Sequence, residues 1–110
     1  MANTYKILGQ VIPANAAVTT AYTVPAATQA ILSTISVTNV TATAYNISVF
    51  VVPSAGTAGV ANALVYTAEL AAGTLQAFTL GITLGAGDSI QVQSSFASFA
   101  NYQVFGQEIS

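Results

Sequence analysis

The side chains that acid–base or metal chemistry would need are few in this sequence. Its carboxylates are Glu69, Asp88 and Glu108, its basic residue is Lys6, and it has no His and no Cys. It therefore offers no imidazole base, no thiolate nucleophile and no zinc site built from His or Cys. A calcium loop needs closely spaced carboxylates, and a hydroxyl nucleophile needs a base. We expect no catalytic residue, no metal and no cofactor, and predict that the chain is not an enzyme.

Each charged residue has a structural role that its neighbours in the sequence predict. Asp88 lies in the segment GAGDS, residues 85–89, where a carboxylate typically accepts hydrogen bonds from turn amides. Glu69 and Glu108 are expected at solvated strand or edge positions, where a charge also discourages wrong strand pairing. Lys6 would pair with Glu108 if the first and last strands are neighbours. The charges thus point to structure rather than to a reaction.

The elements that position these residues are short β-strands. Val, Ile, Thr, Tyr and Phe dominate the patterned segments, and clusters of Pro and Gly separate them, the longest at residues 53–62. Strands are expected near residues 5–12, 19–24, 29–39, 44–52, 63–70, 74–83, 88–95 and 101–109. This spacing predicts an all-β fold, a single antiparallel β-sandwich of about eight strands over residues 1–110. The strand connection is either Ig-like or jelly-roll.

Alternation along the strands predicts which side chains face the core. The inward rows, strand by strand, are Ile31, Ile35 and Val37; Tyr45, Ile47, Val49 and Val51; Phe78, Leu80, Ile82 and Leu84; and Ile90 and Val92. Leu32 is expected to face outward. The turn at residues 40–44 is short, so the strands on either side of it are predicted to form an antiparallel hairpin.

The two ends of the chain carry a small echo. Residues 8–12 read LGQVI and residues 105–109 read FGQEI, each with a Gly in second place. Two terminal strands that pair around a matched bulge would explain the echo, because Gly tolerates the dihedral angles of a bulge. We favour chance similarity instead, because an echo of five residues is weak evidence of a repeat.

Several large apolar side chains fall where a partner would meet them. On the strand at 44–52, Phe50 and Val52 are expected to face outward, under either a long loop or a neighbouring subunit. Aromatic residues are densest between 96 and 105, where they serve either as a hydrophobic anchor or as the last strand of the core. The candidate interface residues are Phe50, Val52, Phe96, Phe99 and Phe105.

Composition narrows the classes of partner. The 110 residues are 54% hydrophobic and 4% charged, with a formal net charge of −2 and a mean hydropathy of +0.68. A surface built from Thr, Ser, Asn, Gln and Ala does not repel its neighbours, which suits packing against copies of itself or a partner. One basic residue cannot neutralise a run of phosphates, so we expect no nucleic acid partner. No apolar run reaches the roughly 20 residues of a membrane span, and the start lacks the apolar region of a secretory signal.

Four segments carry a resemblance to a known group. Residues 4–10 (TYKILGQ), 22–26 (YTVPA), 35–39 (ISVTN) and 86–90 (AGDSI) resemble small virion structural proteins of tailed bacteriophages, and the likeness spans most of the chain. Related sequences often have a Cys beside the strand-ending Asn, where this chain has Thr38. The resemblance implies a β-rich capsid decoration or cement protein, or a tail component.

Composition and resemblance together predict a non-enzymatic virion structural protein. As a capsid decoration or cement protein it would bridge neighbouring capsomers of a phage head, where many weak repeated contacts add up. The expected partners are the major capsid protein and further copies of the chain, as a trimer or dimer, with no nucleic acid and no membrane. The expected location is the capsid surface of the virion, after synthesis in the host cytoplasm. The alternative is a tail or baseplate component, including a receptor- or carbohydrate-binding module that uses the aromatic residues from Phe96 to Phe105.

Overall fold

The computed structural model describes residues 3–79, 81–96 and 98–110 as nine β-strands and one turn of 3-10 helix. The strands are β1 (Asn3–Val11), β2 (Thr19–Thr23), β3 (Gln29–Asn39), β4 (Tyr45–Val52), β5 (Ala63–Leu70), β6 (Leu75–Phe78), β7 (Ile82–Leu84), β8 (Ser89–Ser94) and β9 (Ala100–Ile109), and the helical turn η1 covers Val60–Asn62. The predicted all-β class is confirmed, and the predicted strand ends lie within two residues of the observed ones. The exception is the segment 74–83, which is two strands.

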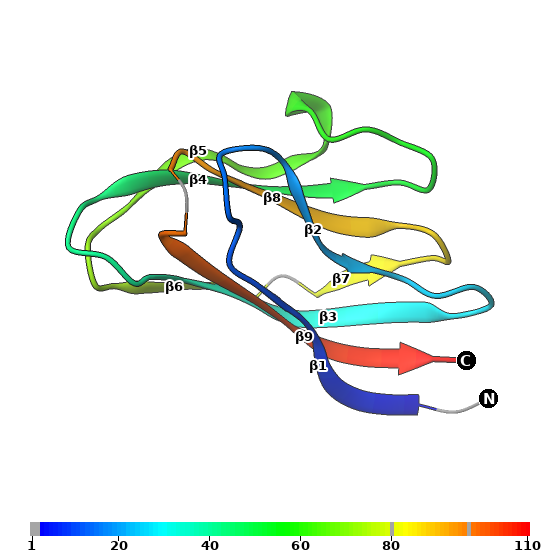
Figure 1. The fold of residues 1–110 in the computed structure, drawn as a ribbon. Coiled ribbons are helices and arrows are strands. Elements are labelled where there is room, and N and C mark those ends of the chain that lie inside the picture. The colour runs from blue at the N-terminus through cyan, green and yellow to red at the C-terminus, as the bar shows by residue number, and fades with distance from the viewer. Residues whose placement is uncertain (1–2, 80, 97) are drawn as a thin grey trace.

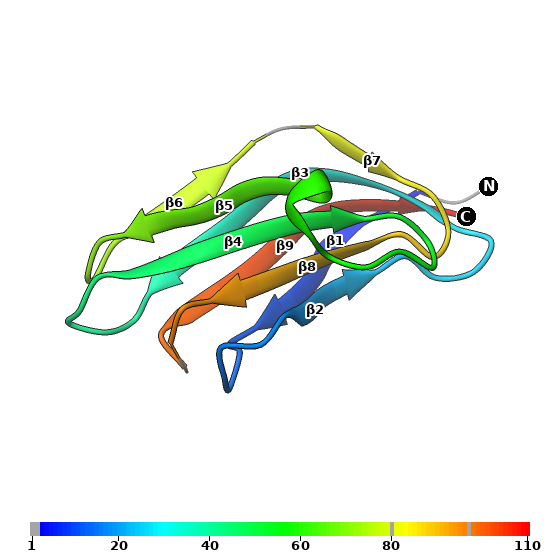
Figure 2. The ribbon, with the colours of Figure 1, turned by 90° about the horizontal axis from the view of Figure 1, so that it is seen from above.

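The strands form two antiparallel sheets packed face to face (Figure 1). Sheet A has the order β1-β9-β3-β6, with β7 also paired to β3, and sheet B has the order β2-β8-β4-β5. Seen from above, sheet B lies over sheet A, and both termini are at the same end of the molecule (Figure 2). The predicted β-sandwich is therefore confirmed.

The strand order decides between the two predicted connections. β6 and β7 pair with the same strand, β3, and Gly81 between them has a φ of +62°, which breaks a strand that is otherwise continuous in direction. Counted as one strand, they leave eight strands in two four-stranded sheets that exchange strands at nearly every connection. This is the jelly-roll arrangement, which occurs in viral capsid domains and lectins.

The predicted hairpin around residues 40–44 is wrong. β3 lies in sheet A and β4 in sheet B, so this short segment crosses from one sheet to the other. Asn39, at the end of β3, is 1% exposed and holds the crossing in place. Its side-chain amide donates to the carbonyl oxygens of Thr43 (2.8 Å) and Leu70 (3.1 Å), and its Oδ1 accepts from both the backbone N–H (2.9 Å) and the hydroxyl (2.7 Å) of Thr41.

A bulge in β3 reverses part of the predicted inward row. The pairing of β3 with β9 shifts between Leu32 and Thr34, so Ser33 is an extra residue. Leu32 is consequently 1% exposed and in the core, whereas Ile31 is half-buried on the outer face. The assignment of Ile31 inward and Leu32 outward was wrong for this reason. Ile35 and Val37, beyond the bulge, are buried as predicted.

The rest of the predicted core agrees with the structure. Ile47, Val49, Leu84, Ile90 and Val92 are at most 2% exposed. The partly buried members of the predicted rows, which pack against this core, are Tyr45, Val51, Phe78 and Ile82. Leu80 lies outside the described residues. The two inward faces therefore meet in one apolar layer between the sheets.

The terminal strands pair, but not around the matched bulge that would have explained the echo, because Gly9 is opposite Val104 and Gly106 is opposite Lys6. β1 runs antiparallel to β9, with an extra residue, Leu8, between Ile7 and Gly9. The two echo glycines are sites of close backbone approach: a Cβ at Gly9 would overlap the carbonyl oxygen of Ala21 in β2, and one at Gly106 would overlap that of Ile31 in β3. Gly9 thus lets the edges of the two sheets meet, and Gly106 brings β9 close to β3.

Candidate functional site

Asp88 has the turn role that its sequence context predicted. Its Oδ1 accepts the backbone N–H of Ser54 at 2.8 Å, and its Oδ2 accepts that of Gly85 at 2.9 Å. The carboxylate therefore ties the turn before β8 to the start of the loop at residues 53–62. Both of its oxygens are used to hold backbone in place.

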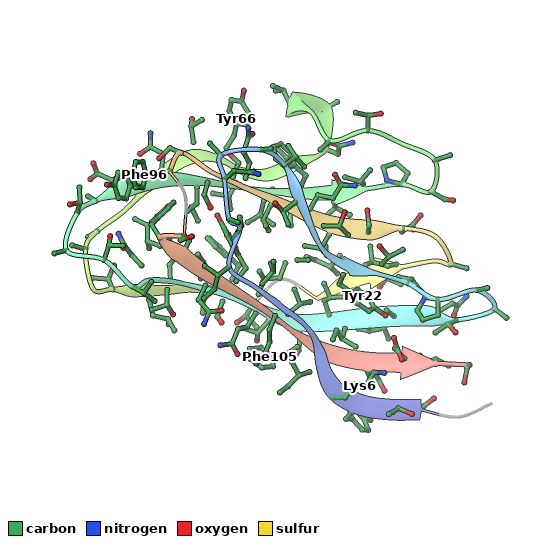
Figure 3. The ribbon with its side chains drawn as sticks, viewed as in Figure 1. Lys6, Tyr22, Tyr66, Phe96 and Phe105 are labelled. Carbon is green, nitrogen blue, oxygen red and sulfur yellow. The ribbon has the colours of Figure 1, made fainter. Side chains whose placement is uncertain are left out.

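Glu108 and Lys6 form the predicted ion pair. Lys6 Nζ lies 2.9 Å from Glu108 Oε1, and the Tyr22 hydroxyl donates to Glu108 Oε2 at 2.7 Å. Figure 3 shows Lys6 on β1 and Tyr22 on the neighbouring sheet at the same end of the sandwich. Hydrogen bonds from Tyr22 and Lys6 hold the pKa of Glu108 below its usual range. Burial, followed by the bond to Glu108 and its charge, raises the pKa of Tyr22.

The solvated position expected for Glu108 is wrong, and the one expected for Glu69 is confirmed. Glu108 is on β9, an inner strand of sheet A, with its side chain 15% exposed and turned toward Tyr22 of sheet B. It tolerates this position because both of its oxygens are paired. Glu69 is exposed on the edge strand β5.

The carboxylates do not converge on one place. Asp88 is in a turn, Glu69 on the edge of sheet B, and Glu108 between the sheets. Within the described residues, no group of three or more His, Cys, Asp or Glu side chains is placed to hold a metal ion. Asp88 binds backbone amides, and Glu108 joins β9 to β1 and β2.

Three of the five candidate interface residues are covered by the chain itself. Phe50 and Val52 are 2% and 1% exposed on the outer side of sheet B, where Phe50 packs edge-on against Tyr66 and Val52 lies next to Gly56 of the loop at residues 53–62. The loop alternative therefore holds for Val52, whereas Phe50 is covered by Tyr66 of the neighbouring strand β5. Phe99 is fully buried, and its ring lies 4.9 Å from that of Tyr45.

Phe96 and Phe105 remain available to a partner. Phe96 is 53% exposed, and its ring stacks on that of Tyr45 with centroids 4.8 Å apart and planes 4° apart. Phe105 is half-buried on the outer face of sheet A. The sticks in Figure 3 place the two apart, Phe96 at the end of the fold near the start of β4 and Phe105 below the middle of sheet A. The dense run of aromatic residues is thus not one cluster.

A polar hollow lies on the outer side of sheet B. It has a volume of about 240 Å³, and its lining includes Asn46, Ser48, Thr67, Gln93 and Ser95. Most of these polar groups already have partners: Ser48 accepts the N–H of Thr67 at 2.9 Å, Ser95 accepts that of Asn46 at 2.9 Å, and Gln93 donates to the carbonyl oxygen of Ala16 at 3.2 Å. The hollow therefore offers a ligand few free hydrogen-bonding groups.

The outer face of sheet A carries an apolar stripe. We use the term outer stripe for Tyr5, Ile7, Ile31 and Phe105. Strand register brings them together, because Tyr5 is opposite Gln107, which is opposite Ile31, and Ile7 is opposite Phe105. Tyr5 is 77% and Ile7 55% exposed. A groove of about 310 Å³ lies on this face, and its lining includes Tyr5, Ile31, Ser33, Phe105 and Gln107.

One polar atom in this groove is unsatisfied. Gln107 lines the groove between Tyr5 and Ile31, and its Oε1 is buried with no hydrogen-bond donor in the part of the chain that the structure describes. A buried acceptor without a partner costs about 1–3 kcal/mol. Because this oxygen is covered, a molecule lying on the outer stripe would not reach it without a change of the Gln107 rotamer.

Comparison with known proteins finds little at the level of sequence. No protein-family model and no curated protein matches the chain. Among solved structures it is similar to a chain in the structure of infectious bursal disease virus, Gx strain, with a TM-score of 0.52 and 12% identity. The likeness covers 97% of this chain and 31% of that one, so this chain spans about a third of the viral chain's length. What the two share is the fold.

Sequence reasoning missed most of the outer stripe. Tyr5 and Ile7 alternate with Thr4 and Lys6, so the period of two predicts that Tyr5 and Ile7 share one face of the strand. Once Lys6 is paired with Glu108 between the sheets, Tyr5 and Ile7 must face outward. Ile31 was assigned to the core because the bulge at Ser33 has no signal in the sequence.

No helix within the described residues is long and apolar enough to cross a membrane.

Proposed function

We propose that the protein is a non-enzymatic structural protein of a virion, and specifically a decoration or cement protein that binds the outside of a phage capsid and bridges neighbouring capsomers. The observation that carries this proposal is the exposed outer stripe on a jelly roll with almost no surface charge. Burying exposed apolar side chains of this kind against a shell removes them from water and lowers the free energy.

Three further observations support the proposal. The jelly roll is a fold of viral capsid domains, and the structural likeness is to a chain in a virus structure. Fold likeness alone does not fix function, so it serves here as support only. The ionisable side chains of the described residues have structural partners or stand alone at an edge, which fits a protein without catalysis.

The outer stripe is the surface we assign to the shell. Its partner is the major capsid protein, and the proposal includes further copies of the chain, as a dimer or trimer, and neither nucleic acid nor membrane. The protein is made in the host cytoplasm and acts on the capsid surface.

Copy number in purified particles tests the proposal. Quantitative mass spectrometry is expected to give a ratio to the major capsid protein of one-to-one or a simple fraction. A ratio hundreds of times lower overturns shell-wide decoration in favour of a tail location. Absence from the particles overturns the virion role altogether.

A matched set of variants then tests the surface. Purified protein is added to particles that lack it, and bound copies per shell are counted. Phe105→Ser is expected to lower occupancy, whereas Phe96→Ala, which removes an exposed aromatic ring elsewhere, leaves it unchanged. Gln107→Leu is expected to keep or raise the stability of the free protein, because it removes the unsatisfied acceptor. Equal occupancy in all three variants would move the shell-binding surface away from sheet A.

A tail or baseplate component, including a carbohydrate-binding module, is the second candidate. The half-exposed ring of Phe96 favours it, because aromatic rings provide a flat apolar platform and jelly rolls also occur among lectins. Glycan-array binding that Phe96→Ala abolishes and Phe105→Ser leaves intact would support this candidate. The hollow on sheet B argues against carbohydrate binding, because most of its polar groups already have hydrogen-bond partners within the chain.

A further inference from the structure

A sheet edge with unpaired N–H and C=O groups pairs readily with another strand, and natural proteins guard such edges. The edges of this sandwich are β1 and β6 with β7 in sheet A, and β2 and β5 in sheet B. The guards used in other proteins are short strands, bulges, charges, prolines and covering segments.

Three of the edges are guarded. β6 and β7 have four and three residues, which is too short for extended pairing. β2 has five residues and meets β1 where Gly9 approaches Ala21. β5 has two shifts in its pairing with β4, a residue with positive φ at Thr67 (+48°), and the charge of Glu69.

The first half of β1 lacks most of these guards, because its charge, Lys6, is paired with Glu108 and its bulge lies beyond residue 7, at Leu8. Residues 3–7 are exposed along their whole length, contain no proline, and pair with β9 without a shift until the bulge at Leu8. Their one charge, Lys6, is neutralised by Glu108 at 2.9 Å. Tyr5 and Ile7, the most exposed members of the outer stripe, are on this edge. It is a flat, neutral and partly apolar strand edge.

We propose that residues 3–7 of β1 pair with the same residues of a second copy of this chain. Two identical strands that pair antiparallel are related by a two-fold axis, so the contact closes at a dimer. An axis at Tyr5 uses the whole free edge and pairs Tyr5 with Tyr5, Thr4 with Lys6, and Asn3 with Ile7. Lys6 then faces Thr4 of the other copy rather than another Lys, so no like charges are opposed.

The dimer joins two copies of sheet A into one continuous sheet. Because Tyr5 and Ile7 face outward, the two outer stripes become one longer apolar surface on the side assigned to the shell. A five-residue edge is about 17 Å long, and its contact is smaller than the roughly 1,200–2,000 Å² of a stable interface. We therefore expect a weak, concentration-dependent dimer in solution that repetition on a symmetric shell would strengthen.

The β1 contact specifies how copies of the chain would associate in the proposed function, and it rests on that proposal. Its test needs only the isolated chain. Sedimentation velocity over a wide concentration range is expected to show a monomer–dimer equilibrium. Tyr5→Lys places two lysines opposite each other at the axis and removes an aromatic pair, which is expected to weaken dimerisation about tenfold or more. Leu75→Lys on β6, the opposite edge of the same sheet at 62% exposure, is the matched control and keeps the dimer.

Cross-linking gives a second readout that does not depend on the Lys variant folding. The chain has no cysteine, so Tyr5→Cys introduces a single thiol at the axis. Residues directly opposite in an antiparallel pair have Cα atoms about 4.5–5.5 Å apart, within the range of a disulfide. Oxidation is expected to give a covalent dimer of Tyr5→Cys and little of the control Leu75→Cys.

Three results would overturn the inference. They are sedimentation as a monomer at every concentration, equal cross-linking of Tyr5→Cys and Leu75→Cys, and a dimer that survives Tyr5→Lys. A copy number in particles typical of a shell protein, combined with a monomer in solution, would leave the virion role standing and remove only the β1 contact. Dimers that survive Tyr5→Lys would place self-association on another surface.

Discussion

Replacing Asn39 by Ala tests whether one buried amide holds the crossing between the sheets. The side chain is 1% exposed and makes four hydrogen bonds, to the carbonyl oxygens of Thr43 and Leu70 and to the N–H and hydroxyl of Thr41. A typical hydrogen bond contributes about 1 kcal/mol net, and a buried group left unpaired costs more. Thr43 is exposed and regains water, whereas the carbonyl oxygen of Leu70 does not. We expect a loss of about 3 kcal/mol.

The matched control is Asn46→Ala. Asn46 is also a strand Asn, but its side chain is exposed, so its removal is expected to change the free energy of unfolding by at most about 0.5 kcal/mol. For a chain of this length, about 3 kcal/mol corresponds to a fall in Tm of about 13 °C. Urea unfolding followed by tyrosine fluorescence and circular dichroism measures the free energy directly.

Asn39→Asp adds a test of the geometry. A carboxylate there would face the carbonyl oxygens of Thr43 and Leu70, so its pKa in the folded protein would rise above the unfolded value of about 3.9. A raised pKa gives stability that is present at low pH and lost as the pH rises, so this variant is expected to be weaker at pH 7 than at pH 4. The reasoning is refuted if Asn39→Ala costs less than about 1 kcal/mol or no more than Asn46→Ala.

Other contacts lead to three further predictions. The pKa of Glu108 is lowered in the folded protein, so this carboxylate stabilises the fold above its unfolded pKa of 4.5, and the stabilisation is lost as the pH falls. In urea titrations from acid to neutral pH, Glu108→Gln is expected to lose less unfolding free energy on acidification than the unmodified protein. Burial raises the pKa of Tyr102 to about 12, so the free energy of unfolding is expected to fall above pH 10. Tyr102→Phe loses the 2.8 Å hydrogen bond to Ser94 and is expected to cost about 1 kcal/mol at pH 7. In thermal unfolding, Gly106→Ala is expected to cost about 1–3 kcal/mol because its Cβ would overlap backbone of β3, and Gly59→Ala, which has open space around it, less than half as much.

The strands were predictable from the sequence because their apolar residues alternate with a period of two over most of their length. β3 and β5 begin and end at the predicted residues. The pairing of the strands was not predictable in the same way. A five-residue link fits both a hairpin within one sheet and a crossing between sheets, and only the buried partners of Asn39 distinguish the two.

The candidate surface was only partly predictable. Aromatic side chains were identified as interface residues by type, but burial depends on what covers them, and for Phe50 that is Tyr66, from a later strand. Ile31 was misplaced by one extra residue at Ser33. An exposed face is set by strand register and bulges, and neither has a strong local signal.

The order of the strands in sheet A has a consequence for how the chain folds during synthesis. β1 is hydrogen-bonded to β9 alone within its sheet, and β9 is inserted between β1 and β3. Among the described strands, β4 and β5 are the one pair that is both consecutive and hydrogen-bonded. At ribosomal rates of about 5–20 residues per second, β1 emerges some 5–20 s before its partner. Folding is therefore expected to start in sheet B and to finish when β9 enters, and a nascent chain halted before β9 would leave both edges of β1 unpaired and Lys6 without Glu108.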